Sequence, residues 1–263
     1  MLTMSHVSKT FNAGTINEKR ALVDCNLHLA PGDFVTIIGG NGAGKSTLMN
    51  MIAGVYPIDA GTITLDGMNI SRLSEPARAK YLGRVFQDPM MGTAADMQII
   101  ENLAMAKRRG KTRTLAWGVT RAEKDEYTDR LRELGLGLEK RLTSKVGLLS
   151  GGQRQALTLL MATLSEPKLL LLDEHTAAST QTAAKVLNLT EQIVGEHQLT
   201  TLMVTHNMND AIRLGNRLIM MHEGRIIYDV QGEEKAALTV ADLLQKFEEV
   251  SGGELANDRM LLN

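Results

Sequence analysis

Hydrophobic positions along the chain predict alternating strands and helices. Three mostly apolar runs, residues 34–38, 168–173 and 200–205, are typical of strands buried on both faces of a parallel sheet. The segment 180–196, between the last two runs, has helical spacing. Before residue 34 apolar and polar positions alternate, which indicates short strands of an antiparallel sheet. Together these elements predict an α/β fold with a mainly parallel sheet and an antiparallel β part.

The middle of the chain has a different pattern, with charged residues interleaved among leucines. This spacing is typical of amphipathic helices and indicates a mainly helical insertion within the α/β domain. A two-stranded hairpin is expected around Glu223 and Gly224 near the end of the chain. The remaining predicted helices cover residues 45–53, 97–109, 121–134, 153–164 and 240–250.

Composition narrows the classes of function. The chain has 29 Lys and Arg against 30 Asp and Glu, so no overall positive field favours nucleic acid, and no nucleic-acid partner is expected. Cys25 is the only cysteine, which excludes an internal disulfide and fits a reducing compartment. No apolar run approaches the roughly 18 residues needed to cross a bilayer, and the first residues lack a signal-peptide pattern. We therefore expect a cytoplasmic protein whose membrane role would need a partner.

A glycine-rich loop follows the first buried run. Residues 39–46 fit the pattern G-x-x-x-x-G-K-[ST] in full. Glycines let the backbone wrap closely round a triphosphate, and N–H groups at the helix N-terminus point at anionic oxygens. Lys45 supplies a positive charge to the β- and γ-phosphates, Ser46 can ligate Mg²⁺, and Thr47 would bond the α-phosphate side. A purely structural turn is the alternative, but the position between a buried strand and a helix favours phosphate binding. The predicted contacts are Gly39, Gly40, Asn41, Gly42, Ala43, Gly44, Lys45, Ser46 and Thr47.

Two carboxylates, Asp173 and Glu174, end the second buried run. In open α/β sheets, ligands bind at the carboxyl ends of strands. Asp173 can hold Mg²⁺ through water, and Glu174 can polarise an attacking water as a general base. Strands often end in acidic residues, so the pair indicates a catalytic site only in combination with the phosphate-binding loop.

The segment 149–153 reads Leu-Ser-Gly-Gly-Gln, and Asp173 follows 23 residues after Ser150. Ser150 is a plausible helix N-cap, although capping alone does not require two glycines and a glutamine. With the loop upstream and the acidic pair downstream, this segment closely resembles the signature of ABC-type ATPases, over residues 1 to about 235. In that family the signature of one copy closes over the γ-phosphate held by a second copy. The residues implied here are Ser150, Gly151, Gly152 and Gln153.

The same resemblance implies roles for three further residues. Phe11 is similar in position to the aromatic residue that stacks on adenine, with a core phenylalanine as the alternative. Gln87 matches the glutamine that senses Mg²⁺ and the attacking water, and His206 matches the switch histidine that contacts the γ-phosphate. The implied catalytic set is Glu174, His206, Lys45 and Gln87, and the implied metal set is Ser46, Gln87 and Asp173.

Four positions depart from the family pattern. His175 replaces a proline, and Thr180 stands where an aspartate usually helps to couple the two sites. Ala156 and Met161 occupy positions that are often arginine. None of these changes removes a catalytic group, so ATP binding and hydrolysis are expected, and the coupling between sites stays open.

The resemblance implies an ABC-type ATPase domain over residues 1–250, with a P-loop NTPase core, a mainly parallel sheet, an antiparallel β subdomain and a helical insertion. The nucleotide-binding core would comprise 1–87 and 151–235, and the helical subdomain 88–150 would carry the signature at its end. Residues 251–263 read as a polar tail.

The implied function is the ATP-hydrolysing subunit of an ABC transporter, with ATP and Mg²⁺ as cofactors, serving uptake of a small solute such as an amino acid. Its partners would be a second ATPase subunit, in a homodimer or a pair, and a separate integral membrane permease; a solute-binding protein is a further candidate. It would lie in the cytoplasm, on the inner face of the cell membrane. The alternative is a soluble ABC-type ATPase of an assembly system such as iron–sulfur cluster biogenesis.

Two surface features have alternative interpretations. Residues 107–113 hold five positive charges, which read either as a solvated face or as a contact surface near membrane headgroups or a permease loop. Met90, Met91 and Met97 would suit an adaptable apolar groove for a permease, or the core.

Overall fold

A computed structural model describes residues 1–111, 118–174 and 180–251 of the chain. The chain divides into two compact units. Unit 1 contains Met1–Arg78 and the chain from Thr200 onward, and unit 2 contains Ala79–Leu199.

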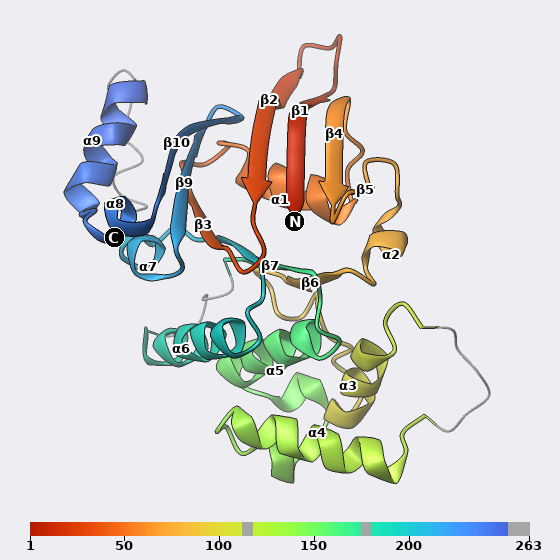
Figure 1. Ribbon diagram of the computed structural model, residues 1–263. Helices are drawn as coiled ribbons and strands as arrows, with labels where there is room; N and C mark the ends of the chain where they lie inside the picture. Colours follow the sequence, from red (N-terminus) through yellow and green to blue (C-terminus); the bar gives the residue numbers. More distant parts are fainter. Residues whose placement is uncertain (112–117, 175–179, 252–263) are drawn as a thin grey trace. The chain divides into compact units, whose positions relative to one another are not determined.

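Unit 1 combines an antiparallel sheet with a second, partly parallel set of strands (Figure 1). The antiparallel sheet has the order β2–β1–β4–β5, formed by β1 (Leu2–Phe11), β2 (Lys19–Leu29), β4 (Ala60–Leu65) and β5 (Met68–Asn69). The second set has the order β10–β9–β3–β8, formed by β3 (Phe34–Ile38), β8 (Thr201–Val204), β9 (Arg217–His222) and β10 (Arg225–Gln231). β3 pairs in parallel with β8 and β9, and β10 returns antiparallel to β9. The alternating strands, the buried run at 34–38 and the late hairpin are therefore confirmed.

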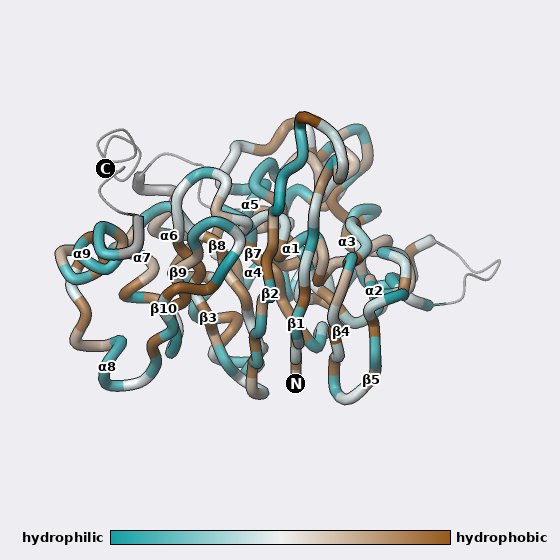
Figure 2. Tube along the Cα trace, turned by 90° about the horizontal axis from the view of Figure 1, so that it is seen from above, coloured by the Kyte–Doolittle hydropathy of each residue, from teal (hydrophilic) through white to brown (hydrophobic). Residues whose placement is uncertain are grey.

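The core of unit 1 lies between these strands and helix α1 (Lys45–Ala53). Every residue of β3 is buried, because strands neighbour it on both edges and its two faces are covered. The hydrophobic stretches of β3 and β9 can be followed in Figure 2. α1 buries Leu48, Met49 and Ile52, and each such side chain contributes about 1.5–3 kcal/mol by leaving water. Gly54 ends the helix in the left-handed conformation, directly after the predicted last helical residue 53.

Arg78, the last residue of α2 (Glu75–Arg78), connects the carboxyl end of α1 to the loop that precedes α2. It is 1% exposed, and its Nη1 donates to the carbonyl oxygens of Met51 at 2.6 Å and Ile52 at 2.9 Å. Its Nε and Nη2 donate to the carbonyls of Leu73 and Ser71. Burial lowers the pKa of the guanidinium from its usual value. The charge is tolerated there because helix C-terminal carbonyls carry partial negative charge.

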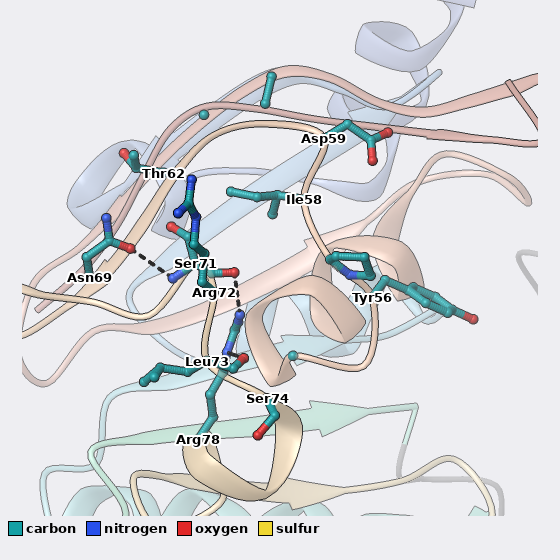
Figure 3. A pocket seen from close by; sticks show the side chains of 14 residues that line it. Tyr56, Ile58, Asp59, Thr62, Asn69, Ser71, Arg72, Leu73, Ser74 and Arg78 are labelled. Carbon is teal, nitrogen blue, oxygen red and sulfur yellow. Dashed lines mark hydrogen bonds between the residues drawn. The ribbon is translucent and has the colours of Figure 1, made fainter.

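A cavity of about 790 Å³ lies beside Arg78 in unit 1, at the opposite end of α1 from the glycine-rich loop. Figure 3 shows Ser71 accepting the hydrogen bond of Arg78 through its carbonyl and donating its own N–H to the Asn69 side chain. None of the site residues predicted from the sequence lines this cavity.

Replacing Arg78 with alanine is expected to lower the free energy of unfolding by about 3 kcal/mol, because the carbonyls of four residues, those of Met51 and Ile52 buried, lose their donor. Urea unfolding monitored by circular dichroism measures this change. The exposed neighbour Arg72 lines the same cavity, so Arg72→Ala should change stability by less than about 0.5 kcal/mol. Equal stability of the two variants would show that Arg78 does not support the helix end.

Unit 2 contains two parallel strands and most of the helical residues (Figure 1). The strands are β6 (Leu82–Val85) and β7 (Leu169–Asp173), and the helices are α3 (Ile99–Lys107), α4 (Arg121–Glu133), α5 (Gly151–Thr163) and α6 (Thr180–Glu196), with short 3-10 turns η1 (Leu138–Lys140) and η2 (Val146–Leu148). α3, α4 and α5 pack around a cluster that includes Leu103, Tyr127 and Leu157. α3 begins two residues later than predicted, because the side chains of Gln98 and Glu101 form a capping box there.

Three short or terminal helices complete unit 1: α7 (Met208–Arg213), α8 (Gly232–Ala236) and α9 (Val240–Ser251). α9 matches the predicted helix at 240–250, and it packs Leu243 and Phe247 against Met208 of α7. The sequence pattern did not predict α7 and α8, which are too short to show a helical period. Among the described helices, none combines the length and apolar character that a bilayer crossing requires.

Candidate nucleotide site

The glycine-rich loop joins the end of β3 to the start of α1, the setting that its pattern requires. Two of its glycines lie too close to neighbouring backbone for any other residue. A methyl group on Gly39 would lie 2.2 Å from the carbonyl oxygen of Met221, and one on Gly44 would lie 2.5 Å from that of Ala21. Gly44 also has φ 102°, where side chains are strained. The loop is thereby held in a tight curve that leads its backbone into a helix N-terminus.

Lys45 is folded back onto this loop. Its side chain is 5% exposed overall, and its Nζ donates to the carbonyl oxygens of Gly39 at 2.6 Å and Gly40 at 3.1 Å. These hydrogen bonds stabilise the curved loop. A change of rotamer would let the ammonium group contact a phosphate bound by the loop. Ser46 and Asn41 are exposed, so their polar groups are open to a ligand.

His206 follows β8, the strand that neighbours β3. The N–H of Thr205 donates to the Ile37 carbonyl at 3.1 Å, so the two parallel strands end at the same edge. The side chain of Asn207 then accepts from the N–H of Asp210 and caps α7. His206 is exposed between strand and cap, and unit 1 therefore brings it to the same edge as the glycine-rich loop.

Phe11 ends β1 and is half-buried, so it is not a core residue. Its ring meets the edge of the Tyr56 ring with centroids 5.2 Å apart at 80°, and Lys9 Nζ lies 5.6 Å from its centroid. No sequence motif indicates Tyr56, which follows α1 in the chain and packs on Phe11. The pair forms a partly exposed aromatic surface in the same unit as the loop, compatible with stacking on a base.

In unit 2, Gln87 and Glu174 meet directly. β6 and β7 run parallel with Val85 opposite Leu172, so the residues two positions further on leave the same edge. Gln87 Nε2 donates to Glu174 Oε2 at 2.7 Å, and Asp173 is the last residue of β7. Glu174 has φ 41°, a conformation that costs a non-glycine residue roughly 1 kcal/mol or more and that clusters at functional sites.

The signature segment forms the start of α5. Ser150 is the N-cap: its hydroxyl accepts from the N–H of Gln153 at 3.3 Å, and the Gln153 side chain accepts from the N–H of Ser150 at 3.2 Å. Ser150 and Gln153 of the signature segment therefore also cap α5. Gly152 is buried, whereas a methyl group on Gly151 would have nothing within 4 Å, so the helix end faces open space. The partial positive charge of this helix N-terminus favours an anion.

The predicted site residues thus fall into two groups. Unit 1 gathers the glycine-rich loop and His206 at one edge and carries Phe11, while unit 2 joins Gln87 to Glu174 and carries the signature.

The four departures have different settings. Ala156 and Met161 are buried in the helical cluster of unit 2, which explains apolar residues there. Thr180 begins α6, and His175 lies outside the described residues.

Three of the five charges in 107–113 have partners within unit 2. Lys107 pairs with Glu126, and Arg108 Nη2 donates to both carboxylate oxygens of Glu123, at 2.8 and 3.1 Å. The Thr120 N–H is the main cause that lowers the pKa of Glu123, and Arg108 lowers it further. Arg109 donates to a backbone carbonyl of α5. These contacts favour a structural interpretation of the segment; Arg113 lies outside the described residues.

Comparisons with known proteins bear on the family to which the chain belongs. A family model described as ABC transporter matches residues 22–177. The chain is 44% identical over 249 residues to the tyrosine transport ATP-binding protein of Clostridioides difficile, which spans 94% of this chain and 99% of that protein. It is 30% identical to a methionine import ATP-binding protein of Lactobacillus delbrueckii, over 97% of this chain and 72% of that protein. A solved dimeric ATP-binding cassette in a post-hydrolysis state, bound to ADP and Pi, superposes with TM-score 0.75 at 26% identity, over 88% of this chain and 98% of that one.

The strand–glycine loop–helix element and the acidic pair at the end of β7 define a P-loop nucleotide-binding protein of the α/β class. The matched family model and the relatives show more: the chain belongs to the ABC transporter family. It is an ATP-binding cassette ATPase, as the sequence predicts.

Proposed function

We propose that this chain is the ATP-hydrolysing subunit of an importer for a small amino-acid-like solute, with tyrosine as the first candidate. The likeness to the tyrosine transport protein, which spans nearly the whole of both chains, supports this solute most strongly. A relative that serves methionine import supports the wider class. The solute itself would be bound by other chains, so the proposed solute rests on sequence similarity to these relatives.

The observation that carries the catalytic part of the proposal is the 2.7 Å hydrogen bond from Gln87 to Glu174. It orients the Glu174 carboxylate, which would accept a proton from a water molecule attacking the γ-phosphate. The glycine-rich loop and Lys45 would hold the triphosphate, and His206 would contact the γ-phosphate from the end of β8.

The donor chemistry of three residues fits Mg²⁺, which prefers oxygen ligands. These are the Ser46 hydroxyl, the Gln87 amide oxygen and the Asp173 carboxylate. Bound Mg²⁺ would neutralise phosphate charge and favour departure of ADP. Gln87 could bind Glu174 and Mg²⁺ at the same time, because its amide nitrogen donates to Glu174 and its amide oxygen could ligate the metal.

We further propose two kinds of protein partner. A second ATPase subunit would place its Ser150 and Gly152 over the γ-phosphate, consistent with the open space beside Gly151 and with the dimeric state of a solved cassette. A separate membrane permease would contact the segment after Gln87, where Met90 is 39% and Met91 71% exposed. The chain would then lie against the inner face of the cell membrane.

Transport in proteoliposomes tests the proposal. The chain, the membrane protein that co-purifies with it and any solute-binding protein encoded nearby are reconstituted with ATP and Mg²⁺ on the ATPase side. We expect ATP-dependent uptake of labelled tyrosine, reduced by excess unlabelled tyrosine but not by spermidine. Uptake of a different solute would reject tyrosine, whereas failure to recover any polytopic membrane partner would reject the transporter assignment.

A further inference from the structure

Lys19, the first residue of β2, was not singled out by any motif, yet it lies at the glycine-rich loop. A methyl group built on Gly42 would stand 3.4 Å from Lys19 Nζ. Lys19 comes close to the loop because β2 packs against it. The Ala21 carbonyl oxygen of β2 lies 2.5 Å from a methyl group built on Gly44. The ammonium group of Lys19 therefore lies beside the phosphate-binding loop, next to Gly42.

The register of the antiparallel sheet relates Lys19 to Phe11. The two residues are directly opposite in the β1–β2 ladder, and opposite residues of an antiparallel pair project from the same face of the sheet. Lys19 thus stands between the aromatic ring proposed to stack on adenine and the loop proposed to hold the phosphates. Its side chain is exposed, and within the described residues no hydrogen bond or ion pair engages its Nζ. This positive charge is available to a ligand.

We infer that Lys19 is a nucleotide-binding residue that contacts the ribose–α-phosphate part of the nucleotide. The inference rests on the proposed function of Phe11 and the loop. In a nucleoside triphosphate the α-phosphate lies between the base and the terminal phosphates, and Lys19 lies between the groups that would hold those two ends. Lys45 would contact the β- and γ-phosphates, so the two lysines would contact different phosphates of the same nucleotide.

This division predicts which nucleotides depend on Lys19. ADP and ATP share the ribose and the α-phosphate, so Lys19→Gln should weaken both by the same factor, about fivefold for an exposed charge-assisted contact. Lys19→Arg keeps the charge and should bind within about twofold of the wild type. The loss caused by Lys19→Gln should shrink as NaCl rises from 0.05 to 0.5 M, because salt screens the contact (about 10 Å Debye length at 0.1 M).

The measurement is calorimetric titration of the full chain with ADP and with the slowly hydrolysed ATP analogue that carries an imido group between its β- and γ-phosphorus atoms. Arg20→Gln is the matched control: Arg20 is the next residue, is exposed, projects from the opposite face and lies 3.9 Å from Glu18. It should bind both nucleotides like the wild type, and the thermal midpoints of all variants should agree.

The outcomes separate this inference from the proposed function. If the wild type binds neither nucleotide, both are overturned. If the wild type binds and Lys19→Gln binds equally well, the proposed function stands and the role of Lys19 is overturned. A loss confined to the triphosphate analogue would place Lys19 at the γ-phosphate and overturn the assigned contact.

Discussion

Lys45→Ala is expected to weaken ATP binding by about a hundredfold, because charge-assisted contacts to phosphate are worth roughly 1.5–3 kcal/mol and this change also removes a brace of the loop. The Lys45 ammonium donates to the Gly39 and Gly40 carbonyls at 2.6 and 3.1 Å. Alanine cannot hold those carbonyls or offer a charge to the β- and γ-phosphates. Equilibrium titration with a fluorescent ATP derivative measures the loss.

Lys235→Ala provides the matched control. Lys235 is 2% exposed, lies in the same unit and likewise donates to two backbone carbonyls, those of Leu214 and Gly215. Its removal should reduce stability while leaving ATP affinity within about twofold of the wild type, since it lies on α8 and not in the glycine-rich loop. An unchanged affinity in Lys45→Ala would contradict the proposed phosphate cradle.

The elements that position the site could be predicted because their patterns are local. The buried run at 34–38 is β3, the helix 45–53 is α1, and a side chain on Gly39 or Gly44 between them would clash with the backbone of β9 or β2. The signature at Ser150 was predictable for a second reason, since the same side chains that form the motif also cap α5. In these places sequence motif and local backbone energy favour the same structure.

Other features depend on register and on contacts between distant segments. Lys19 lies opposite Phe11 after several register shifts in the β1–β2 ladder, and its Nζ lies close to Gly42. Arg78 is a buried guanidinium satisfied by carbonyls 26 and 27 residues earlier, a pattern that no periodicity encodes. The basic segment looked like a surface patch because its partners, such as Glu123 and Glu126, lie on another helix. Long-range geometry of this kind is absent from a linear pattern.

Glu174→Gln is expected to reduce ATP turnover by about 10²–10⁴-fold, the usual contribution of a general base, while ATP still binds. Glutamine has nearly the same shape as glutamate, and its amide oxygen can still accept the 2.7 Å hydrogen bond from Gln87. The variant therefore removes the proton acceptor and keeps the geometry. Because ATP would stay intact between two copies, gel filtration with ATP and Mg²⁺ should show a dimer for this variant.

Two matched variants make the result decisive. Glu166 also has a left-handed φ, 46°, and lies in unit 2 before the start of β7, so Glu166→Gln should hydrolyse ATP at the wild-type rate. Ser150→Arg in the Glu174→Gln background should return the protein to a monomer that still binds ATP, because a large cation at the exposed helix start would block the second copy. Wild-type phosphate release by Glu174→Gln would reject Glu174 as the base. A dimer that persists with Ser150→Arg would instead show that the signature does not close over the nucleotide, and the general base would then act within an interface formed by other residues.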